Sequence, residues 1–455
     1  MKSDLKIFKR QYLLIFICIK YLVMKCSAKK LNGSKVFMLV LDGVVYDFEK
    51  YTLNTPNIAS IAKNGVKAER MIPSFPSDTW PSMTTLATGL YTESHGIISN
   101  YFLDIQTNKT FKYTDKPSDY ENNGKFFTKE PIWLTNQKQG GASAVYYFPG
   151  YNGFKEKPRY HNSPNISSND NIETFQNTVD LIMQYIQNDN NLNFVLIWID
   201  KPDLTGHEFG KNSLQYKDAL ESVDRDVVGY VLEKLNSYPE INLILTSDHG
   251  FIDIDYKSKL QVKFLNDYLQ SGSYQSNWAG GSCFLRPKNG FTIDDLVNNL
   301  TSLSQNNFRI YRRDKAFQDI PKYLHYRDNI NIPPILILAD REWVLEERVN
   351  PPGCCSGRHG YDIAYVEMST IFYARGPAFR KGVTLNAFES VNVVPLIAHL
   401  LGIVPQPNNG SLIVFNNVLE TNKSVNLEQL FILAQLFILA CLFIVTVYFF
   451  KNNFL

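Results

Sequence analysis

A strong charge of one sign is missing from this sequence. Its 46 lysine and arginine residues nearly balance its 44 aspartate and glutamate residues, which gives a formal net charge of +2. No run of basic residues and no basic helix stands out, so we do not expect nucleic acid as a partner. Single phosphate groups remain as candidate ligands.

Cysteine is also scarce, with six in 455 residues. Three of them fall in the apolar segments at the two ends of the chain, which leaves Cys283, Cys354 and Cys355. Three thiols in an oxidising compartment allow one bridge and exclude a disulfide framework. We expect Cys283 to pair with either Cys354 or Cys355.

Long hydrophobic runs occur only at the two ends. Residues 1–28 combine several lysines, the apolar stretch YLLIFICI and a small-residue site, which predicts a secretory signal peptide. Residues 430–450 read LFILAQLFILACLFIVTVYFF, which is long enough to cross about 30 Å of hydrocarbon. A removable lipid-anchor signal is the alternative, but Lys451 and the short polar tail favour a retained span.

These segments predict the layout of the chain and its location. The catalytic domain is expected over 29–405, followed by a linker at 406–429, the transmembrane helix at 430–450 and a cytoplasmic tail at 451–455. We therefore expect a single-pass plasma-membrane protein whose folded domain is extracellular. Sequons for N-glycosylation fit that location.

Between the ends, patterns of short buried strands alternate with helical ones. Four continuous runs rich in β-branched or aromatic residues predict strands at KVFMLVL, SAVYYF, NFVLIWI and NLILTS. Helical stretches lie between them, notably at 171–187 and 213–235. We therefore expect an α/β fold with a doubly wound, mostly parallel sheet covered on both faces. The alternation loosens over 256–345, where we expect a small inserted subdomain.

Acidic residues and histidines follow three of these strands. Asp42 comes after VFMLVL, Asp203 and His207 follow FVLIWI, and Asp248 and His249 follow LILTS. Each Asp taken alone could cap a turn or helix, but independent caps give no reason for Asp and His at successive strand ends. Ligands of open α/β sheets bind beyond the carboxyl ends of the strands. We therefore expect these side chains to meet at one edge of the sheet.

One more histidine, His359, lies in the glycine-rich loop GRHGYD and can reach the same rim. Three Asp and three His are too many ligands for one tetrahedral zinc ion but suit two. Two ions about 3.5 to 4 Å apart can clamp the attacking and leaving oxygens of a phosphoryl transfer. The sequence therefore predicts a pair of Zn²⁺ ions.

The stretch FPSDTWP holds Thr79 between an acid and an aromatic ring. A helix cap is the simplest interpretation of Thr79, since Pro81 fits a first helical turn and MTTLATGL continues with helical character. A threonine hydroxyl is a poor nucleophile unless a base or a metal removes its proton. Beside a pair of zinc ions, Thr79 becomes a candidate nucleophile toward phosphorus.

Five motifs stand in order along the chain: FPSDTWP, TGLYTESHGIISN, PDLTGHEFG, TSDHG and GRHGYD. In this order and spacing they resemble the nucleotide pyrophosphatase/phosphodiesterase family within the alkaline phosphatase superfamily. The resemblance covers residues 36–403 and implies an alkaline-phosphatase-like fold. A lone catalytic domain with a C-terminal span is most similar to the short membrane-anchored type within that family.

The resemblance also implies a role for each site residue. One zinc ion would be held by Asp42, Thr79, Asp248 and His249. The other would be held by Asp203, His207 and His359. Asn100 would hold the phosphate oxygens, and Trp80 would stack on the nucleotide base. The base pocket would be completed by Phe148, Tyr160 and Trp198.

At two positions this chain lacks a lysine of the family pattern. Nucleotide-cleaving members often have lysine before the nucleophile and after the asparagine, where this chain has Asp78 and Tyr101. Fewer positive charges near the phosphates predict weaker binding of nucleoside triphosphates.

We therefore expect an extracellular phosphodiesterase or pyrophosphatase with two zinc ions. It would cleave extracellular nucleotides or dinucleotides to nucleoside monophosphates through a covalent intermediate on Thr79. Two alternatives stay open: a choline-type phospholipid or headgroup phosphodiesterase on the same scaffold, and a catalytically silent surface receptor. A silent receptor would be expected to have lost ligands, and all six are present.

Overall fold

The computed structural model describes residues 34–51, 53–112, 124–162, 172–255, 261–305, 307–314, 319–348 and 355–420. The described residues up to Val418 form one compact unit. The predicted signal peptide, membrane span and tail all lie outside the described residues. Within those residues, no helix is both long and apolar enough to cross a membrane.

An eight-stranded sheet with the strand order β19-β2-β18-β9-β1-β8-β6-β7 forms the centre of this unit. Its central strand β1 (Lys35–Asp42) pairs in parallel with β8 (Leu192–Pro202) and with β9 (Ile241–Ser247). Beyond β8, the sheet continues in parallel through β6 (Ala142–Tyr146) and β7 (Tyr160–His161). All four predicted strands are therefore confirmed.

On the other side of β1, the described part of the sheet includes antiparallel pairings. There β18 (Phe372–Arg375) runs antiparallel to both β9 and β2 (Val66–Ala68), and β19 (Val383–Leu385) is parallel to β2. The prediction of a mostly parallel α/β sheet is confirmed, with β18 as the exception.

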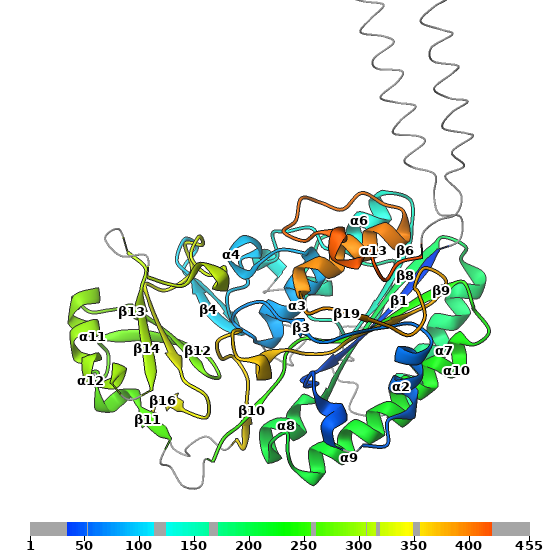
Figure 1. Cartoon of the computed structure of the whole chain (residues 1–455). Helices are drawn as coiled ribbons and strands as arrows, with labels where there is room; N and C mark the ends of the chain where they lie inside the picture. The colour runs from blue at the N-terminus through cyan, green and yellow to red at the C-terminus, as the bar shows by residue number, and fades with distance from the viewer. Residues whose placement is uncertain are drawn as a thin grey trace, which may run out of the picture. The chain divides into compact units, whose positions relative to one another are not determined.

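Helices cover both faces of the sheet (Figure 1). One face carries α2 (Pro56–Lys63), α7 (Ile172–Asn188) and α10 (Gly229–Leu235). The opposite face carries α3 (Thr79–Thr88), α6 (Ile132–Lys138) and α13 (Val393–Leu401). Because both faces are covered, the central strands are apolar on both sides, and every residue of β9 is buried.

The predicted helix at 213–235 forms with one irregularity. It consists of α9 (Leu214–Ser222), a π-helical turn at Val223–Val228 and α10. The turn places the buried carboxylate of Asp224 at the start of α2, where it accepts the main-chain N–H of Asn57 at 3.1 Å and of Ile58 at 2.7 Å. A remote side chain thus satisfies the first N–H groups of α2.

The region of the predicted subdomain forms a second, antiparallel sheet. Its strands, in spatial order, are β12 (Tyr274–Ala279), β13 (Ser282–Pro287), β15 (Ile335–Ala339) and β14 (Phe308–Arg312). Helices α11 (Ile293–Asn299) and α12 (Thr301–Ser304) and the strand pair β11 (Val262–Phe264) and β16 (Val344–Glu346) accompany it. Phe284 of β13 packs edge-on against Phe75, 6.3 Å between ring centroids, so this sheet supports the FPSDTWP segment.

Short elements complete the described chain. They are β3 (Met71–Ile72), α4 (Thr92–His95), β4 (Tyr101–Asp104), β5 (Lys109–Lys112), α8 (Asp203–Phe209), β10 (Ile252–Asp253), β17 (Gly357–Arg358) and β20 (Phe388–Glu389).

Two sequence-based expectations change in the structure. Cys283 is buried in β13, opposite Trp278, and both Cys283 and Cys355 are free thiols, so the bridge expected at Cys283 is not formed; Cys354 lies outside the described residues. The segment after residue 405, expected to be a linker, continues the folded unit. Its Phe415 is fully buried against Phe372 and Phe388.

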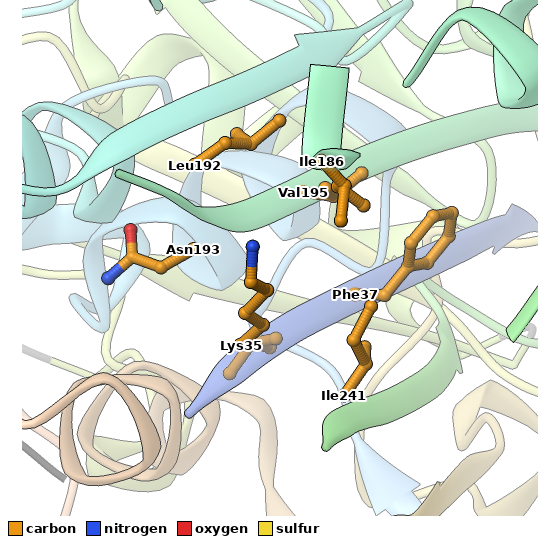
Figure 2. Close-up of a pocket in the computed structure, with 8 residues that line it drawn as sticks. Lys35, Phe37, Ile186, Leu192, Asn193, Val195 and Ile241 are labelled. Atoms are coloured by element: carbon orange, nitrogen blue, oxygen red, sulfur yellow. The ribbon is translucent and has the colours of Figure 1, made fainter. Parts of the chain in front are cut away.

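A small pocket lies at the amino ends of the central strands (Figure 2). Lys35, Leu192 and Ile241, which begin β1, β8 and β9, contribute to its lining. Since the polar strand ends described next lie at the opposite edge of the sheet, this pocket is separate from the candidate site.

Candidate active site

Three carboxylates meet at the carboxyl edge of the sheet. Asp42 is the last residue of β1, Asp248 directly follows β9, and Asp203 opens α8 directly after β8. Because β8 and β9 both pair with β1, their ends arrive side by side. Asp42 and Asp248 are 3% and 1% exposed. The fold thus brings these three predicted site residues together.

The three predicted histidines lie in the same place. The Nε2 atom of His249 is 3.4 Å from Asp42 Oδ1, 3.4 Å from Asp248 Oδ2 and 4.0 Å from Asp203 Oδ1. His207, one helical turn after Asp203 on α8, has its Nε2 3.5 Å from Asp203 Oδ2. His359, just after β17, has its Nε2 3.9 Å from Asp203 Oδ1 and 3.2 Å from His207 Nε2.

Main-chain carbonyls fix the orientation of each imidazole. The Nδ1 atom of His207 lies 3.0 Å from Gly357 O, that of His359 2.9 Å from Ser77 O, and that of His249 3.3 Å from Gly250 O. An Nδ1–H that donates to a carbonyl leaves Nε2 as a lone-pair acceptor. The Nε2 atoms of His207 and His359 face each other at 3.2 Å, an arrangement that a shared cation would stabilise.

The carboxylates of the cluster also have oxygens that are available to a cation. Asp42 Oδ1, Asp203 Oδ1 and Asp248 Oδ2 are buried and accept no hydrogen bond from any residue that the structure describes. These are the same oxygens that face His249 Nε2. Buried charges normally occur paired or bound to a metal. The donor set of carboxylate oxygens and imidazole nitrogens therefore fits two divalent cations, and zinc suits it.

Burial and mutual repulsion shift the protonation of this cluster. Burial, together with the neighbouring Asp248 and Asp203, raises the pKa of Asp42 well above its ordinary value. Burial also raises the pKa of Asp203 to about 7. For His359, burial and the nearby His249 and His207 hold the pKa well below its ordinary value. Burial is the largest cause of each shift, and a bound cation would offset its cost for the two carboxylates.

The potential ligands separate into two overlapping groups. Asp42, Asp248 and His249 form one, and Asp203, His249 and His359 form the other. His249 Nε2 has a single lone pair, so it can bind one ion only. Because His207 supplies an imidazole beside Asp203 and His359, the second group is complete without His249. This assignment agrees with the two ligand sets implied by the family resemblance.

Thr79 lies beside the first group of ligands. It is the first residue of α3, and its Oγ1 is 3.4 Å from His249 Nε2. Asp78, not Thr79, occupies the N-cap position of that helix. Thr79 is therefore not the helix cap, and its hydroxyl faces the ligand cluster.

Asn100 is held next to Thr79 by its neighbours. Its Oδ1 accepts the main-chain N–H of Trp80 at 2.9 Å, and its Nδ2 donates to Asp78 Oδ1 at 2.7 Å. The motif residue Glu93 binds a distant segment, because its Oε2 accepts the main-chain N–H of Arg327 at 2.6 Å and of Asp328 at 3.0 Å.

The predicted base-pocket residues are mostly buried. Trp80 is 1% exposed, and its ring lies 5.2 Å from Phe111 and 5.8 Å from Phe127 between centroids. Phe148, which follows β6, is also 1% exposed, and Trp198 on β8 is 7% exposed. Neither face of the Trp80 ring is open in this structure, so its role in stacking on a base stays a prediction.

The structure does not bring Tyr160 to this group. Its ring stacks on Tyr185 at 4.1 Å, and its hydroxyl donates to Asp189 Oδ2 at 3.0 Å. Asp189 precedes the amino end of β8, whereas the ligands lie at the carboxyl ends of the strands. Tyr160 therefore supports the far edge of the sheet in this conformation.

Two further residues shape the site without any sequence signal strong enough to identify them. Phe251 lies beneath all three imidazoles, with its ring centroid 5.1 Å from that of His207, 5.8 Å from His249 and 5.5 Å from His359. Gly43 donates its N–H to Asp248 Oδ1 at 3.0 Å. Its φ of +68° and the close approach of Phe251 both require glycine. The letters following the aspartates, DG and DHGF, are the only hint of either role.

Comparison with known proteins agrees with this geometry. Residues 36–362 match the family model Type I phosphodiesterase / nucleotide pyrophosphatase. Ectonucleotide pyrophosphatase/phosphodiesterase family member 7 of Mus musculus is 33% identical over 390 residues, which cover 83% of this chain and 85% of the relative. Family member 5 of Homo sapiens is 32% identical over 387 residues, covering 84% and 77%.

Solved structures give the same result. Murine ectonucleotide pyrophosphatase/phosphodiesterase 5 matches with a TM-score of 0.77 and 31% identity, over 85% of this chain and 100% of that one. A second structure of the murine protein is an inactive threonine-to-alanine variant in complex with AMP. By its motifs, fold and site, this chain belongs to the type I phosphodiesterase/nucleotide pyrophosphatase family of hydrolases.

Proposed function

We propose that this protein is an extracellular phosphodiesterase and pyrophosphatase that uses two zinc ions to convert nucleotides or dinucleotides to nucleoside monophosphates. One observation carries the proposal. Buried carboxylate oxygens without hydrogen-bond donors and the Nε2 atoms of three histidines converge on the spot where the Thr79 hydroxyl lies 3.4 Å from His249 Nε2. That arrangement suits a nucleophile that must lose its proton at neutral pH.

The reaction proceeds in two displacements at phosphorus. When bound, the zinc ions would acidify the Thr79 hydroxyl and the incoming water and offset the phosphate charge. Thr79 Oγ1 attacks in line, forming an O–P bond while the bond to the leaving oxygen breaks. Asn100 donates from its side-chain amide to a phosphate oxygen. Water then cleaves the threonine ester, which releases the monophosphate and returns the hydroxyl.

Nucleotides are the proposed substrates for two reasons. The murine relative has been solved with AMP, a nucleoside monophosphate. An aromatic residue, Trp80, also directly follows the nucleophile, and Phe148 just after β6 and Trp198 within β8 are the further candidates for the base pocket. Choline is also attracted to aromatic faces, so a choline phosphodiester remains the second candidate. Asp78, a buried carboxylate next to the nucleophile, argues against highly charged triphosphates.

The location follows from segments outside the described residues. The signal pattern of residues 1–28 and the apolar run of 430–450 support a protein anchored by one helix, with the catalytic domain outside the cell. The relatives named above are ectonucleotide enzymes, which agrees with this location.

The test is a substrate panel assayed with the full-length protein in detergent. Nucleoside diphosphates, dinucleotides and choline phosphodiesters are compared with and without a strong chelator. We expect chelator-sensitive release of monophosphate from the nucleotides, and less than a hundredth of that rate for Thr79→Ala at unchanged metal content. Thr88→Ala, a buried threonine at the other end of α3, is the matched control.

The outcomes separate the candidates. Turnover of choline phosphodiesters alone would replace the nucleotide assignment and keep the mechanism. Substantial residual activity in Thr79→Ala would exclude covalent catalysis by this residue. Lack of turnover on every compound in a fully metal-loaded protein would favour the silent receptor.

A further inference from the structure

Asp78 is a buried carboxylate at the position of a helix cap, but its hydrogen bonds go to Asn100. It is 3% exposed and stands at the N-cap of α3, where an Asp side chain usually accepts N–H groups of the first turn. Its side chain makes no such capping bond. Its oxygens instead bind a segment 22 residues further along the chain.

Both oxygens of Asp78 are used by the same partner. Oδ1 accepts from the side-chain Nδ2 of Asn100 at 2.7 Å, and Oδ2 accepts from the main-chain N–H of Asn100 at 3.2 Å. Hydrogen bonds to a carboxylate are roughly twice as strong as those between neutral groups. Two of them on one residue fix both the backbone and the side chain of Asn100.

Asn100 also binds the first turn of α3. Its Oδ1 accepts the main-chain N–H of Trp80 at 2.9 Å, a bond of the kind expected from a helix cap. With Oδ1 held by a donor and one Nδ2 hydrogen held by an acceptor, the amide has one orientation only. The second Nδ2 hydrogen remains for a ligand beside Thr79. Asn100 therefore caps α3 in place of Asp78, and Asp78 aims Asn100.

We infer that Asp78 is a positioning residue that fixes the side-chain amide of Asn100 so that its second N–H meets the phosphate at Thr79. This inference rests on the proposed function. It assigns Asp78 no contact with the substrate. Because Asp78 Oδ1 also lies 3.7 Å from Nδ1 of His359, an effect through Asn100 must be separated from one through this histidine, which would persist in the absence of Asn100. The two can be separated, because residues that act through each other are not additive.

The test is a double-mutant cycle on the full-length protein. Asp78→Ala, Asn100→Ala and the double variant are compared with the parent in turnover of bis(p-nitrophenyl) phosphate. Removal of one oxyanion donor costs about 100- to 1000-fold in kcat, and we expect about 100-fold for Asn100→Ala and about tenfold for Asp78→Ala. In the Asn100→Ala background, Asp78→Ala should cost less than about twofold. The loss should fall on kcat, with KM changed less than about threefold.

A second measurement does not depend on turnover. Calorimetric binding of inorganic phosphate to the zinc-loaded variants should show the same non-additivity. If the parent protein proved inactive, the proposed function would be refuted, but the coupling between Asp78 and Asn100 could still be measured by phosphate binding. Thr292→Ala removes the N-cap of α11, a helix that accompanies the second sheet. It is the control for loss of a cap and should leave kcat unchanged. If Asp78→Ala does not fold, Asp78→Asn replaces it in the cycle.

The outcomes are distinct. Equal losses from Asp78→Ala in both backgrounds, in turnover and in phosphate affinity, would show that Asp78 acts independently of Asn100 and would overturn the inference. A lower melting temperature with parental kcat would also overturn it, since Asp78 would then be structural only.

Discussion

Gly43 offers a sharp test of how tightly the site is packed. A Cβ added there would lie 2.5 Å from the ring of Phe251 and 3.0 Å from both Cα and Oδ1 of Asp203. At φ +68° a non-glycine residue costs about 1–2 kcal/mol, and overpacking a tight core adds about 1–3 kcal/mol. We therefore expect Gly43→Ala to lower the free energy of unfolding by about 2–5 kcal/mol.

The same substitution should also lower activity, because Phe251 contacts all three histidines. Moving its ring displaces the imidazoles, and a misplacement of about 1 Å can cost about 100-fold in rate. Urea unfolding, zinc content and kcat/KM on a nucleotide diester measure the three effects. The matched control is Gly140→Ala, since Gly140 also has a positive φ, +92°, but a Cβ there would meet nothing within 4 Å.

Gly140→Ala should therefore show only the backbone cost and retain parental activity and metal. If Gly43→Ala loses no more stability than this control and keeps its zinc and turnover, the packing of Phe251 against the histidines does not set the site geometry. The ligands would then be held by their own hydrogen bonds alone.

Three further predictions address the metal, the pH dependence and the core. A strong chelator at mildly acid pH, where protons compete for the imidazoles, should abolish turnover, and added zinc should restore it; full activity in protein shown to be metal-free would contradict this. Burial lowers the pKa of His95 from 6.5 to about 3, so its contribution to stability is complete above pH 6.5 and is lost on acidification. Urea unfolding should show the parent losing stability relative to His95→Gln by about 1.4 kcal/mol per pH unit between pH 6 and 4, and parallel curves would disprove this. Trp80→Ala should destabilise the protein by about 3–5 kcal/mol in the same assay, because Trp80 is 1% exposed, and a loss below 1 kcal/mol would contradict its burial.

The parts of the site that depend on strand ends could be predicted from the sequence. Asp42, Asp203 and Asp248 each follow an apolar run, and parallel strands must place such residues at one edge. His207 follows Asp203 by one helical turn, so its approach to the same edge is a local consequence of α8. These predictions succeed because each rests on a short segment with one strong preference.

The parts that depend on distant packing could not be predicted in this way. Trp80 follows the nucleophile, yet whether its ring is free depends on Phe111 and Phe127, which arrive from other segments. Asp78 stands where a cap belongs, but its carboxylate is bound by Asn100, which arrives from another segment. Side-chain contacts between segments far apart in sequence leave no periodic signal.

The π-helical turn between α9 and α10 lets one continuous helix serve two layers of the protein. On α9, the hydroxyl of Tyr216 donates to Gly43 O at 2.6 Å, while the buried face of α10 packs against α7. Successive residues of an α-helix are rotated by about 100° around the helix axis. The extra residue of a π-helical turn therefore rotates all following side chains of the helix around that axis. A one-residue deletion at Val223–Val228 would restore a regular α-helix while turning α10 away from α7 and Asp224 away from α2. The π-helical turn therefore sets the rotation of α10 relative to α9, so that Tyr216 can bind Gly43 while α10 packs against α7.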